Sequence, residues 1–515
     1  MSTSEFRHTA SNAGMIGAAA LAGSVVGFVL QLLVAYYFGA GNQTDAFFMA
    51  QSTSEMLAKL LLGGSVTAVF IPLFVERLAV KNRDGAWRLA FNILNIMTVA
   101  YIALLGCIWL LAGPFVHFIA PGFNGDTYTL TVSLLRLLLP SFLFLFLVEF
   151  ATSILHSFKL FTLPATLRIV APLVSILSIL VFVHTLGIHA LAIGIVAGSI
   201  IQLAILVVGL RRQGMKYRFF IDIRDPAIRS LVRLVYPFIF SLLMTQGAGI
   251  VYRILVSGLE EGSLSALKFA EKITQLLTIV FLNSVTLVIY PLLSEKASLH
   301  DTAGMRSTIA SAMRLVVFVS LPLILAVAIL REPLVTFLYQ RGSFTASDTA
   351  ATSIALLYLV LGLTTTGISS ILGHAVLAIQ KTRAAVAITI ISQVVAISLF
   401  YFLVPTMGMA GLALASSLVP LSSALLYFLY LRRHIPALST IFAHTTYIKT
   451  IILAIVSSAI VWVVSLSLTN YVLLQIIASL LAGALCYLVA ARAWHIEEMQ
   501  EVLGMVRAKL TRRAV

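Results

Sequence analysis

A small set of charged residues lies within stretches of the sequence that are otherwise apolar. A charge at the centre of a membrane helix costs about 2.5–3.5 kcal/mol to insert, so it usually faces a partner or a water-filled cavity. Basic side chains in such a cavity can neutralise an anionic ligand. These candidates for an anion-binding site are Lys59, Arg136, Arg253, Lys268 and Lys272, with the acidic residues Asp45, Glu55, Glu149 and Glu271.

The deep lysines are the most informative of these residues. Lys59 lies near the middle of its apolar stretch, and Glu55 precedes it by one helical turn, so a purely structural ion pair is an alternative to ligand binding. Lys268 and Lys272 are four residues apart and repel each other on a helix unless an anion lies between them. Glu271 can serve as one partner, and a bound anion could be another. Together they predict a mildly cationic cavity.

The remaining charges allow simpler interpretations. Arg253 and Lys268 lie close to an expected outer loop, so their side chains could extend to the membrane interface. Arg136 fits either a structural or a binding role, and Glu149 could pair with a neighbouring helix. Asp45 lies at the outer end of its apolar stretch. Sequence alone does not separate these interpretations.

The elements that must position these residues are transmembrane helices. Of the 515 residues 60% are hydrophobic and 10% are charged, against about 25% charged residues in soluble domains. Apolar runs of about 20 residues or more, each able to cross a hydrocarbon core of about 30 Å, recur along the chain. We predict fourteen spans, near residues 11–38, 43–76, 87–119, 128–157, 161–183, 188–210, 228–257, 263–295, 306–339, 347–379, 384–405, 408–431, 447–468 and 471–493.

The distribution of lysine and arginine gives these spans an orientation. Most of the 34 basic residues fall in alternate loops, with a large group between residues 211 and 233, whereas the opposite loops contain Arg331 and Arg341. The positive-inside rule then places both termini in the cytoplasm. This distribution also accounts for the net charge of +15 without nucleic acid as a partner.

Catalytic and metal-binding motifs are missing from the sequence. It contains no H-E-x-x-H zinc motif, no phosphate-binding G-x-x-x-x-G-K-[ST] loop and no G-x-S-x-G nucleophile motif. Cys107 and Cys486 both lie in apolar runs, which offers no disulfide framework. We expect neither an enzyme nor a cofactor.

A short string near residue 65 recurs later in the chain. "SVTAVFIPLFVE" (65–76) returns as "SVTLVIYPLLSE" (284–295), 219 positions further on. Six predicted spans separate the copies, so both cross the membrane in the same direction, as in transporters built from parallel repeats. Chance similarity between two apolar helices is the alternative. The repeat predicts alternating access of two lobes to a central site.

The fold we predict is therefore an all-α integral membrane protein with two pseudo-symmetric six-helix lobes plus two extra C-terminal helices. The expected divisions are an N-lobe (1–210), a cytoplasmic linker (211–227), a C-lobe (228–434), spans 13 and 14 (435–493) and a cytoplasmic tail (494–515).

Three further strings carry a family resemblance. "FGAGNQTDAFFMA" (38–50), "APGF" (120–123) and "YQRGSFTASD" (339–348) resemble motifs of the MurJ/MviN lipid II flippases of the MOP exporter superfamily, and the resemblance extends over nearly the whole chain. It implies a multi-pass protein of the bacterial cytoplasmic (inner) membrane that flips an undecaprenyl-diphosphate-linked peptidoglycan precursor, lipid II, to the outer leaflet. It also implies a cationic cavity for the diphosphate and a lipid-tail groove at spans 13 and 14, in a protein that we expect to be monomeric.

The sequence departs from the family where arginines are usual. Ser24 and Leu30 replace arginines of span 1, and "AKLLLGG" (58–64) keeps only Lys59 as a basic residue, with Gly63 in place of an acid. The usual Asp-Arg pair of span 8 appears as Glu271 and Lys272. Lysine offers a point charge where arginine offers a planar, bidentate fork. A paralogue that moves another lipid-linked oligosaccharide, for an exopolysaccharide or teichoic-type polymer, is therefore an alternative.

Two other classes remain open. A small-molecule antiporter would favour a carboxylate-rich ion site, which isolated Glu149 supports poorly. A non-transporting scaffold agrees with the lost arginines but gives no reason to keep Lys59, Glu271 and Lys272.

The first prediction concerns topology. Reporter fusions after residues 220, 300 and 500 should report a cytoplasmic location, and fusions near residues 124 and 260 an external one, because the basic loops stay inside. Alkaline phosphatase and green fluorescent protein fusions measure this. A cytoplasmic signal at residue 124 would refute both the span assignment and the parallel repeat.

Overall fold

The computed structural model describes residues 3–62, 65–79, 83–225, 228, 246–469 and 471–500. Within these ranges every regular element is a helix and no strand occurs, which confirms the prediction of an all-helical protein. A chain in lipid must satisfy its backbone hydrogen bonds internally, and a helix does so within one segment. The chain divides into two compact units, residues 1–265 and 266–515.

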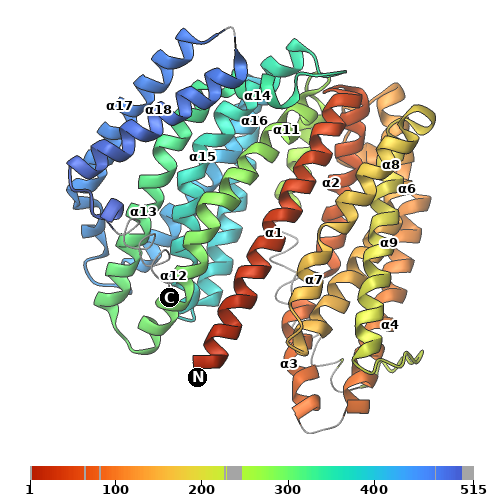
Figure 1. Cartoon of the computed structure of the whole chain (residues 1–515). Helices are drawn as coiled ribbons and strands as arrows, with labels where there is room; N and C mark the ends of the chain where they lie inside the picture. The colour runs from red at the N-terminus through yellow and green to blue at the C-terminus, as the bar shows by residue number, and fades with distance from the viewer. Residues whose placement is uncertain are drawn as a thin grey trace. The chain divides into compact units, whose positions relative to one another are not determined.

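The first unit is built from long helices that pack side by side (Figure 1). Helix α6 packs against α2, α4 and α9, while α8 packs against α9 and α1. The helices of this unit are α1 (Thr3–Phe38), α2 (Asn42–Leu62), α3 (Ser65–Ala79), α4 (Arg83–Leu110), α5 (Ala112–Ile119), α6 (Gly125–Ser157), α7 (Thr162–Leu167), α8 (Val170–Leu186) and α9 (His189–Arg212). Residues 246–257 are also helical.

Aromatic side chains form much of the core of the first unit. Phe70 of α3 lies 4.8 Å from Phe150 of α6, measured between ring centroids. Tyr101 of α4 stacks on Phe146 of α6 at 4.6 Å, and its hydroxyl donates to the carbonyl of Ala58 in α2 at 3.2 Å. A buried tyrosine needs such a partner, because an unpaired hydroxyl in an apolar core is costly.

The second unit contains the remaining helices. Helix α15 packs against α16, α13 and α12, while α17 and α18 run side by side (the blue helices of Figure 1). The elements are α11 (Ser263–Leu277, whose first residues belong to the first unit), a π-helix η1 (Thr278–Leu282), α12 (Asn283–Ser298), α13 (Thr302–Ile329), α14 (Arg331–Tyr339), α15 (Ala346–Ala378), α16 (Thr382–Leu431), a 3-10 helix η2 (Leu438–Ala443), α17 (Thr445–Ser467) and α18 (Val472–Ala493).

Ten helical segments of the described ranges are long and apolar enough to cross a membrane. One of them, α16, contains a break at Gly408, where φ is +56° and ψ is −130°. This left-handed φ suits glycine, and the break falls where the sequence predicts the boundary between two spans. Most of the predicted span near 228–257 lies outside the described residues. A multi-span helical protein is thus confirmed, and the number of fourteen spans stays a prediction.

The two copies of the repeated string occupy similar helices. The first begins α3 and the second lies in α12, and each helix contains the shared proline, Pro72 or Pro291. In the second copy the π-helix η1, which ends at Leu282, directly precedes α12.

The end of the second unit is held by a buried ion pair. Arg314 of α13 donates through Nε to Glu498, whose side chain is 1% exposed, and through Nη2 to Glu497 at 3.4 Å. Ile496 and Met499 pack beside this pair into a core that includes Phe318 and Tyr487. The segment that follows α18 is thereby fixed to α13.

This ion pair gives the second prediction. Glu498→Gln should lower the midpoint of thermal unfolding in detergent, because removal of one partner from a buried pair costs about 3–5 kcal/mol. Glu497→Gln is the matched control and should change little, because its side chain is 59% exposed and exposed pairs contribute about 0–1 kcal/mol. Equal midpoints for the two variants would show that the buried pair contributes no more than the exposed one.

Candidate functional site

A buried carboxylate organises one end of the first unit. Asp45, in the first turn of α2, is 4% exposed and accepts hydrogen bonds from the backbone N–H groups of Gly262 and Ser265, both at 2.7 Å. The hydroxyl of Ser265 donates to the same carboxylate. These donors belong to the start of α11, so Asp45 supplies the acceptor and the negative charge that a helix N-terminus favours.

Two close backbone approaches support this arrangement. Gly262 has a φ of +82°, and a Cβ atom there would lie 2.5 Å from the carbonyl oxygen of Ala40. A Cβ atom on Gly122 would lie 2.2 Å from the carbonyl oxygen of Ser257, whose hydroxyl accepts from the Gly122 N–H at 3.1 Å. The strings 38–50 and 120–123 therefore both pack against residues 257–265, and this packing explains their glycines.

Arg253 is anchored on α2. Its guanidinium donates to the carbonyl oxygen of Ser52 at 2.7 Å, to the Ser52 hydroxyl at 3.3 Å and to the carbonyl oxygen of Gly249 at 2.8 Å. The sulfur of Met56 lies 3.5 Å from the same group. The donors of Arg253 are therefore directed at α2 and at Gly249, and the interpretation that its side chain extends to the membrane interface stays a prediction.

Glu55 lies on the same part of α2. It is exposed, accepts from the Gln51 side chain at 3.1 Å and interacts electrostatically with Arg253. The side chain of Lys59, one turn further along α2, lies outside the described residues. The first unit thus brings Glu55 and Arg253 together beside the helix turn that carries Lys59.

The second cluster of predicted residues lies on α11, in the second unit. Lys268 donates to Glu271 at 2.6 Å, and both side chains are partly exposed. Lys272 is partly buried and follows Lys268 by one turn. Glu271 therefore pairs with Lys268, as the sequence allows, and both side chains remain partly exposed.

The string 339–348 supports this part of α11. The hydroxyl of Tyr339 donates to the carbonyl of Phe269 at 3.2 Å, and Phe344 packs edge-on against the same phenylalanine. Thr345 and Asp348 form a capping box that begins α15. The string therefore does two things. It begins α15, and it packs against α11, the helix that carries Lys268 and Lys272.

Two predicted residues lie elsewhere in the first unit. Arg136 of α6 is exposed, donates to the carbonyl oxygen of Trp109 at 3.2 Å and lies over the indole ring at 5.2 Å. Such an arginine and tryptophan pair is typical of a membrane interface. Glu149 of α6 is also exposed. The structure does not bring either residue together with Glu55 and Arg253 in the contacts described.

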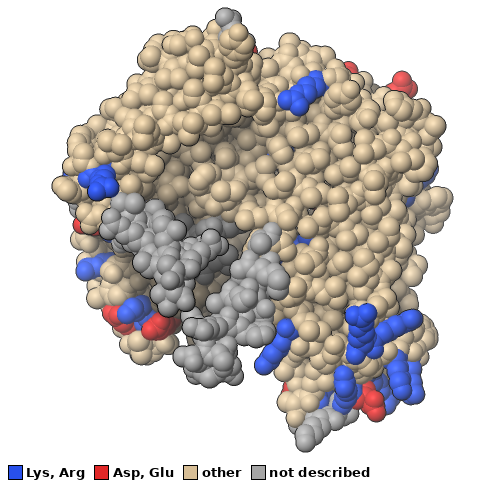
Figure 2. All heavy atoms as spheres, in the orientation of Figure 1, with Lys and Arg blue, Asp and Glu red and all other residues tan. Residues whose placement is uncertain are grey.

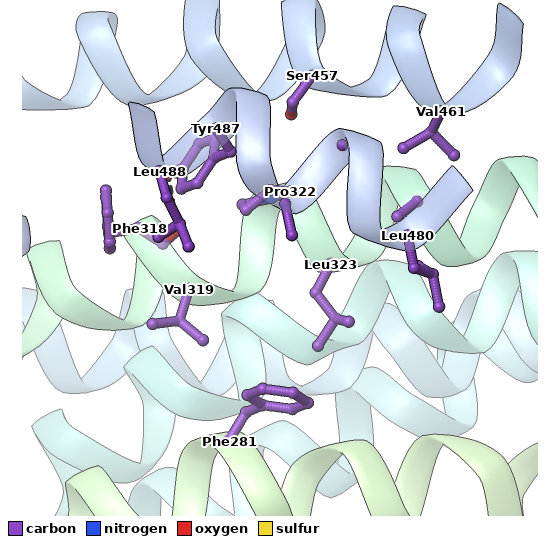
Figure 3. A pocket seen from close by; sticks show the side chains of 13 residues that line it. Phe281, Phe318, Val319, Pro322, Leu323, Ser457, Val461, Leu480, Tyr487 and Leu488 are labelled. Carbon is purple, nitrogen blue, oxygen red and sulfur yellow. Dashed lines mark hydrogen bonds between the residues drawn. The ribbon is translucent and has the colours of Figure 1, made fainter. Parts of the chain in front are cut away.

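An apolar pocket of about 290 Å³ lies among α13, α17 and α18 in the second unit. Figure 3 shows side chains from these helices around it, with Phe281 at one side. A Cβ atom on Gly483 would lie 2.4 Å from Val461, so glycine allows α17 and α18 to approach closely here. The lining residues are Phe281, Phe318, Val319, Pro322, Leu323, Ala326, Ser457, Val461, Leu480, Gly483, Ala484, Tyr487 and Leu488.

Comparison with known proteins decides the family. A sequence profile described as "Lipid II flippase MurJ" matches residues 34–482, which include both the α2 and α11 clusters and most of the residues that line the apolar pocket. The chain belongs to the lipid II flippase MurJ family. It is 26% identical over 435 residues to a probable lipid II flippase MurJ of Rhizobium tropici, covering 82% of this chain and 80% of that protein. It is 25% identical to the lipid II flippase MurJ of Burkholderia cenocepacia, covering 79% and 81% of the two chains.

Solved structures show the same fold. A structure titled "Lipid II flippase MurJ, inward closed conformation" matches with a TM-score of 0.81 at 23% identity and covers 94% of this chain and 99% of that chain. An inward-facing MATE multidrug transporter of the MOP superfamily matches with a TM-score of 0.67 at 15% identity, covering 82% and 96%. At these identities the likeness concerns the fold alone.

Some residues of the site were missed by the sequence interpretation. Gly262 and Ser265 donate to Asp45 from more than 200 positions away, so no local pattern reveals them. A partial signal was present, because a serine and glycine cluster precedes α11 and is typical of a helix start. No comparable sequence pattern predicts that Arg253 donates to Ser52.

Arg253 gives the third prediction. Arg253→Ala should reduce transport strongly, and Arg253→Lys should restore little, because a lysine lacks the planar fork that contacts Ser52 and Gly249 together. Arg136→Ala is the control and should be mild, since Arg136 is exposed beside Trp109. Transport measured at matched protein abundance tests this, and a fully active Arg253→Ala variant would contradict it.

Proposed function

We propose that the protein moves lipid II, a polyprenyl-diphosphate-linked peptidoglycan precursor, from the inner to the outer leaflet of the bacterial cytoplasmic membrane by alternating access. The observation that carries the proposal is the family profile over residues 34–482. The named relatives are lipid II flippases, and they match this chain over about four fifths of its length. The deep lysines of α2 and α11 agree with an anionic substrate.

The proposed mechanism assigns each cluster one role. Lys59 and Lys272 neutralise the diphosphate, Glu271 orients Lys268, and Glu55 and Arg253 hold the turn of α2 that carries Lys59. Asp45 fixes the start of α11. The apolar pocket among α13, α17 and α18 receives part of the lipid tail.

The finer parts of the proposal concern the membrane. The chain crosses it fourteen times as a monomer, with two six-helix lobes, two additional helices and both termini in the cytoplasm. A membrane potential that is negative inside favours outward movement of a phosphate by about 2.3 kcal/mol per charge per 100 mV. Flipping therefore needs no bound cofactor in this proposal.

A second candidate is a flippase for another lipid-linked oligosaccharide. Ser24, Leu30 and Ala58 occupy positions where the resemblance implies arginines. Without these arginines, the binding site is less specific for a phosphate group. Conditional depletion of a cell's lipid II flippase, with this chain supplied in trans, separates the two functions. Rescue supports lipid II, and failure at normal abundance supports the paralogue.

The deep lysines give the fourth prediction. Lys59→Ala or Lys272→Ala should abolish the appearance of the lipid headgroup on the outer leaflet, whereas Lys→Arg at either position should retain it because the charge survives. Lys296→Ala is the matched control, since Lys296 pairs with Asp301 at 3.4 Å near the end of α12 and should be dispensable.

A double variant distinguishes charge neutralisation from a structural pair. If Lys59 only balances Glu55, the change Glu55→Gln should be as harmful as Lys59→Ala, and the combined variant should recover transport. If Lys59 meets the substrate, the combined variant should stay inactive. Recovery would reduce Lys59 to a structural residue.

A further inference from the structure

Two asparagines of α4 form hydrogen bonds with the segment that follows α9. This segment, residues 213–222, is called the strap below. Asn92 is fully buried and makes two hydrogen bonds with the backbone of Asp222, donating to its carbonyl oxygen at 2.9 Å and accepting from its N–H at 2.7 Å. Asn95 is 4% exposed and donates to the carbonyl oxygen of Phe220 at 3.0 Å. Its side-chain oxygen accepts from the hydroxyl of Tyr217 at 2.8 Å.

These bonds fix an otherwise irregular segment. Residues 215–222 have no regular secondary structure, so their backbone groups need other partners. Asn92 and Asn95 supply those partners from one face of α4, and Arg88 lies over the ring of Phe220 at 4.5 Å. A buried amide that lost its partner would be costly, so the strap and the asparagines hold each other in place.

The strap forms one wall of a cavity of about 690 Å³. This volume is within the range of about 300–1,000 Å³ that is usual for ligand pockets. The wall of the cavity is mostly apolar, and its charged residues are Arg211 and Lys216, next to Tyr217. Val207 of α9 also lines the cavity.

The surroundings of the cavity show what kind of ligand suits it. Lys and Arg side chains gather at the end of the first unit where α3 and α4 lie in Figure 1, as Figure 2 shows. Arg83 donates to the carbonyl oxygen of Gln213, so this basic end includes the strap. Beside the cavity, Val208 is 51% exposed, as expected of a lipid-facing residue in a membrane helix. An apolar chain and an anionic headgroup would therefore both be accommodated.

We propose that this cavity binds an anionic phospholipid from the leaflet that faces the basic loops. An acyl chain lies against α4, α6 and α9, and the phosphate lies between the side chains of Arg211 and Lys216. Basic pockets between membrane helices bind acidic lipid headgroups for this reason. The site belongs to the first unit alone and is independent of the substrate that the protein transports.

The cavity is tested with a matched pair of neighbouring variants. The full-length protein in detergent is titrated with phosphatidylglycerol or phosphatidylcholine, and lipid retention is measured by native mass spectrometry. Val207→Trp places an indole in the cavity and should lower phosphatidylglycerol retention by about tenfold. Val208→Trp adds the same group on the exposed side and should leave retention unchanged.

The two charged residues of the cavity wall, Arg211 and Lys216, are tested without altering its apolar part. Arg211→Gln with Lys216→Gln should remove most of the preference for phosphatidylglycerol over phosphatidylcholine, because each basic residue near a lipid headgroup contributes attraction. Arg212→Gln with Arg218→Gln removes the same charge from exposed positions outside the lining and should keep the preference. Both pairs are exposed, so the comparison remains informative if Val207→Trp fails to fold.

Three outcomes would overturn the proposal. One is equal retention of the two phospholipids by the unaltered protein, and another is unchanged retention in both the Val207→Trp and the Arg211→Gln/Lys216→Gln variants. The third is displacement of phosphatidylglycerol by undecaprenyl phosphate at equal concentration, which would assign the cavity to a polyprenyl tail. None of these outcomes would affect the complementation test of lipid II transport.

Discussion

The carboxylate of Asp45 imposes the constraint on which the cationic part of the molecule depends. It accepts two backbone N–H groups and one hydroxyl from residues 262 and 265, at the point where α11 begins. A helix that begins at a fixed place presents its later side chains at fixed angles, about 100° apart. The directions of Lys268 and Lys272 therefore follow from an interaction that lies about one turn and two turns before them, respectively. A buried side chain of low polarity at position 45 would leave those donors without an acceptor.

The charged residues in the apolar helices follow a common pattern of pairing. Arg253 has most of its donors satisfied by α2, Lys268 pairs with Glu271, and Arg136 lies over Trp109. Each arrangement lowers the cost of keeping a charge in a membrane protein. Side chains held by several hydrogen bonds are poorly placed to follow a moving ligand. Lys272 is partly buried on the same helix, four residues beyond Lys268.

The sequence predicts local features of this fold well and long-range contacts poorly. Apolar runs predict the helices, and the repeated serine and proline positions predict that α3 and α12 correspond, because both signals are local. The break in α16 is also a local feature, because Gly408 can adopt the positive φ that the break requires. By contrast, Arg314 meets Glu498 across 184 positions, and Asn92 meets Asp222 across 130. Nothing in the spacing of such residues specifies a partner, because tertiary packing brings them together.

The missing arginines and the retained lysines are related through the chemistry of the phosphate group. An arginine fork fixes the orientation of a phosphate with two parallel hydrogen bonds, whereas a lysine attracts it with little directional demand. Ser24, Leu30 and Ala58 cannot supply a fork, so in the proposed function neutralisation of the diphosphate depends on point charges at Lys59 and Lys272. Point charges recognise the total negative charge of a ligand more than its shape. Discrimination among lipid-linked substrates must then come from groups beyond the diphosphate, namely the saccharide or the lipid tail.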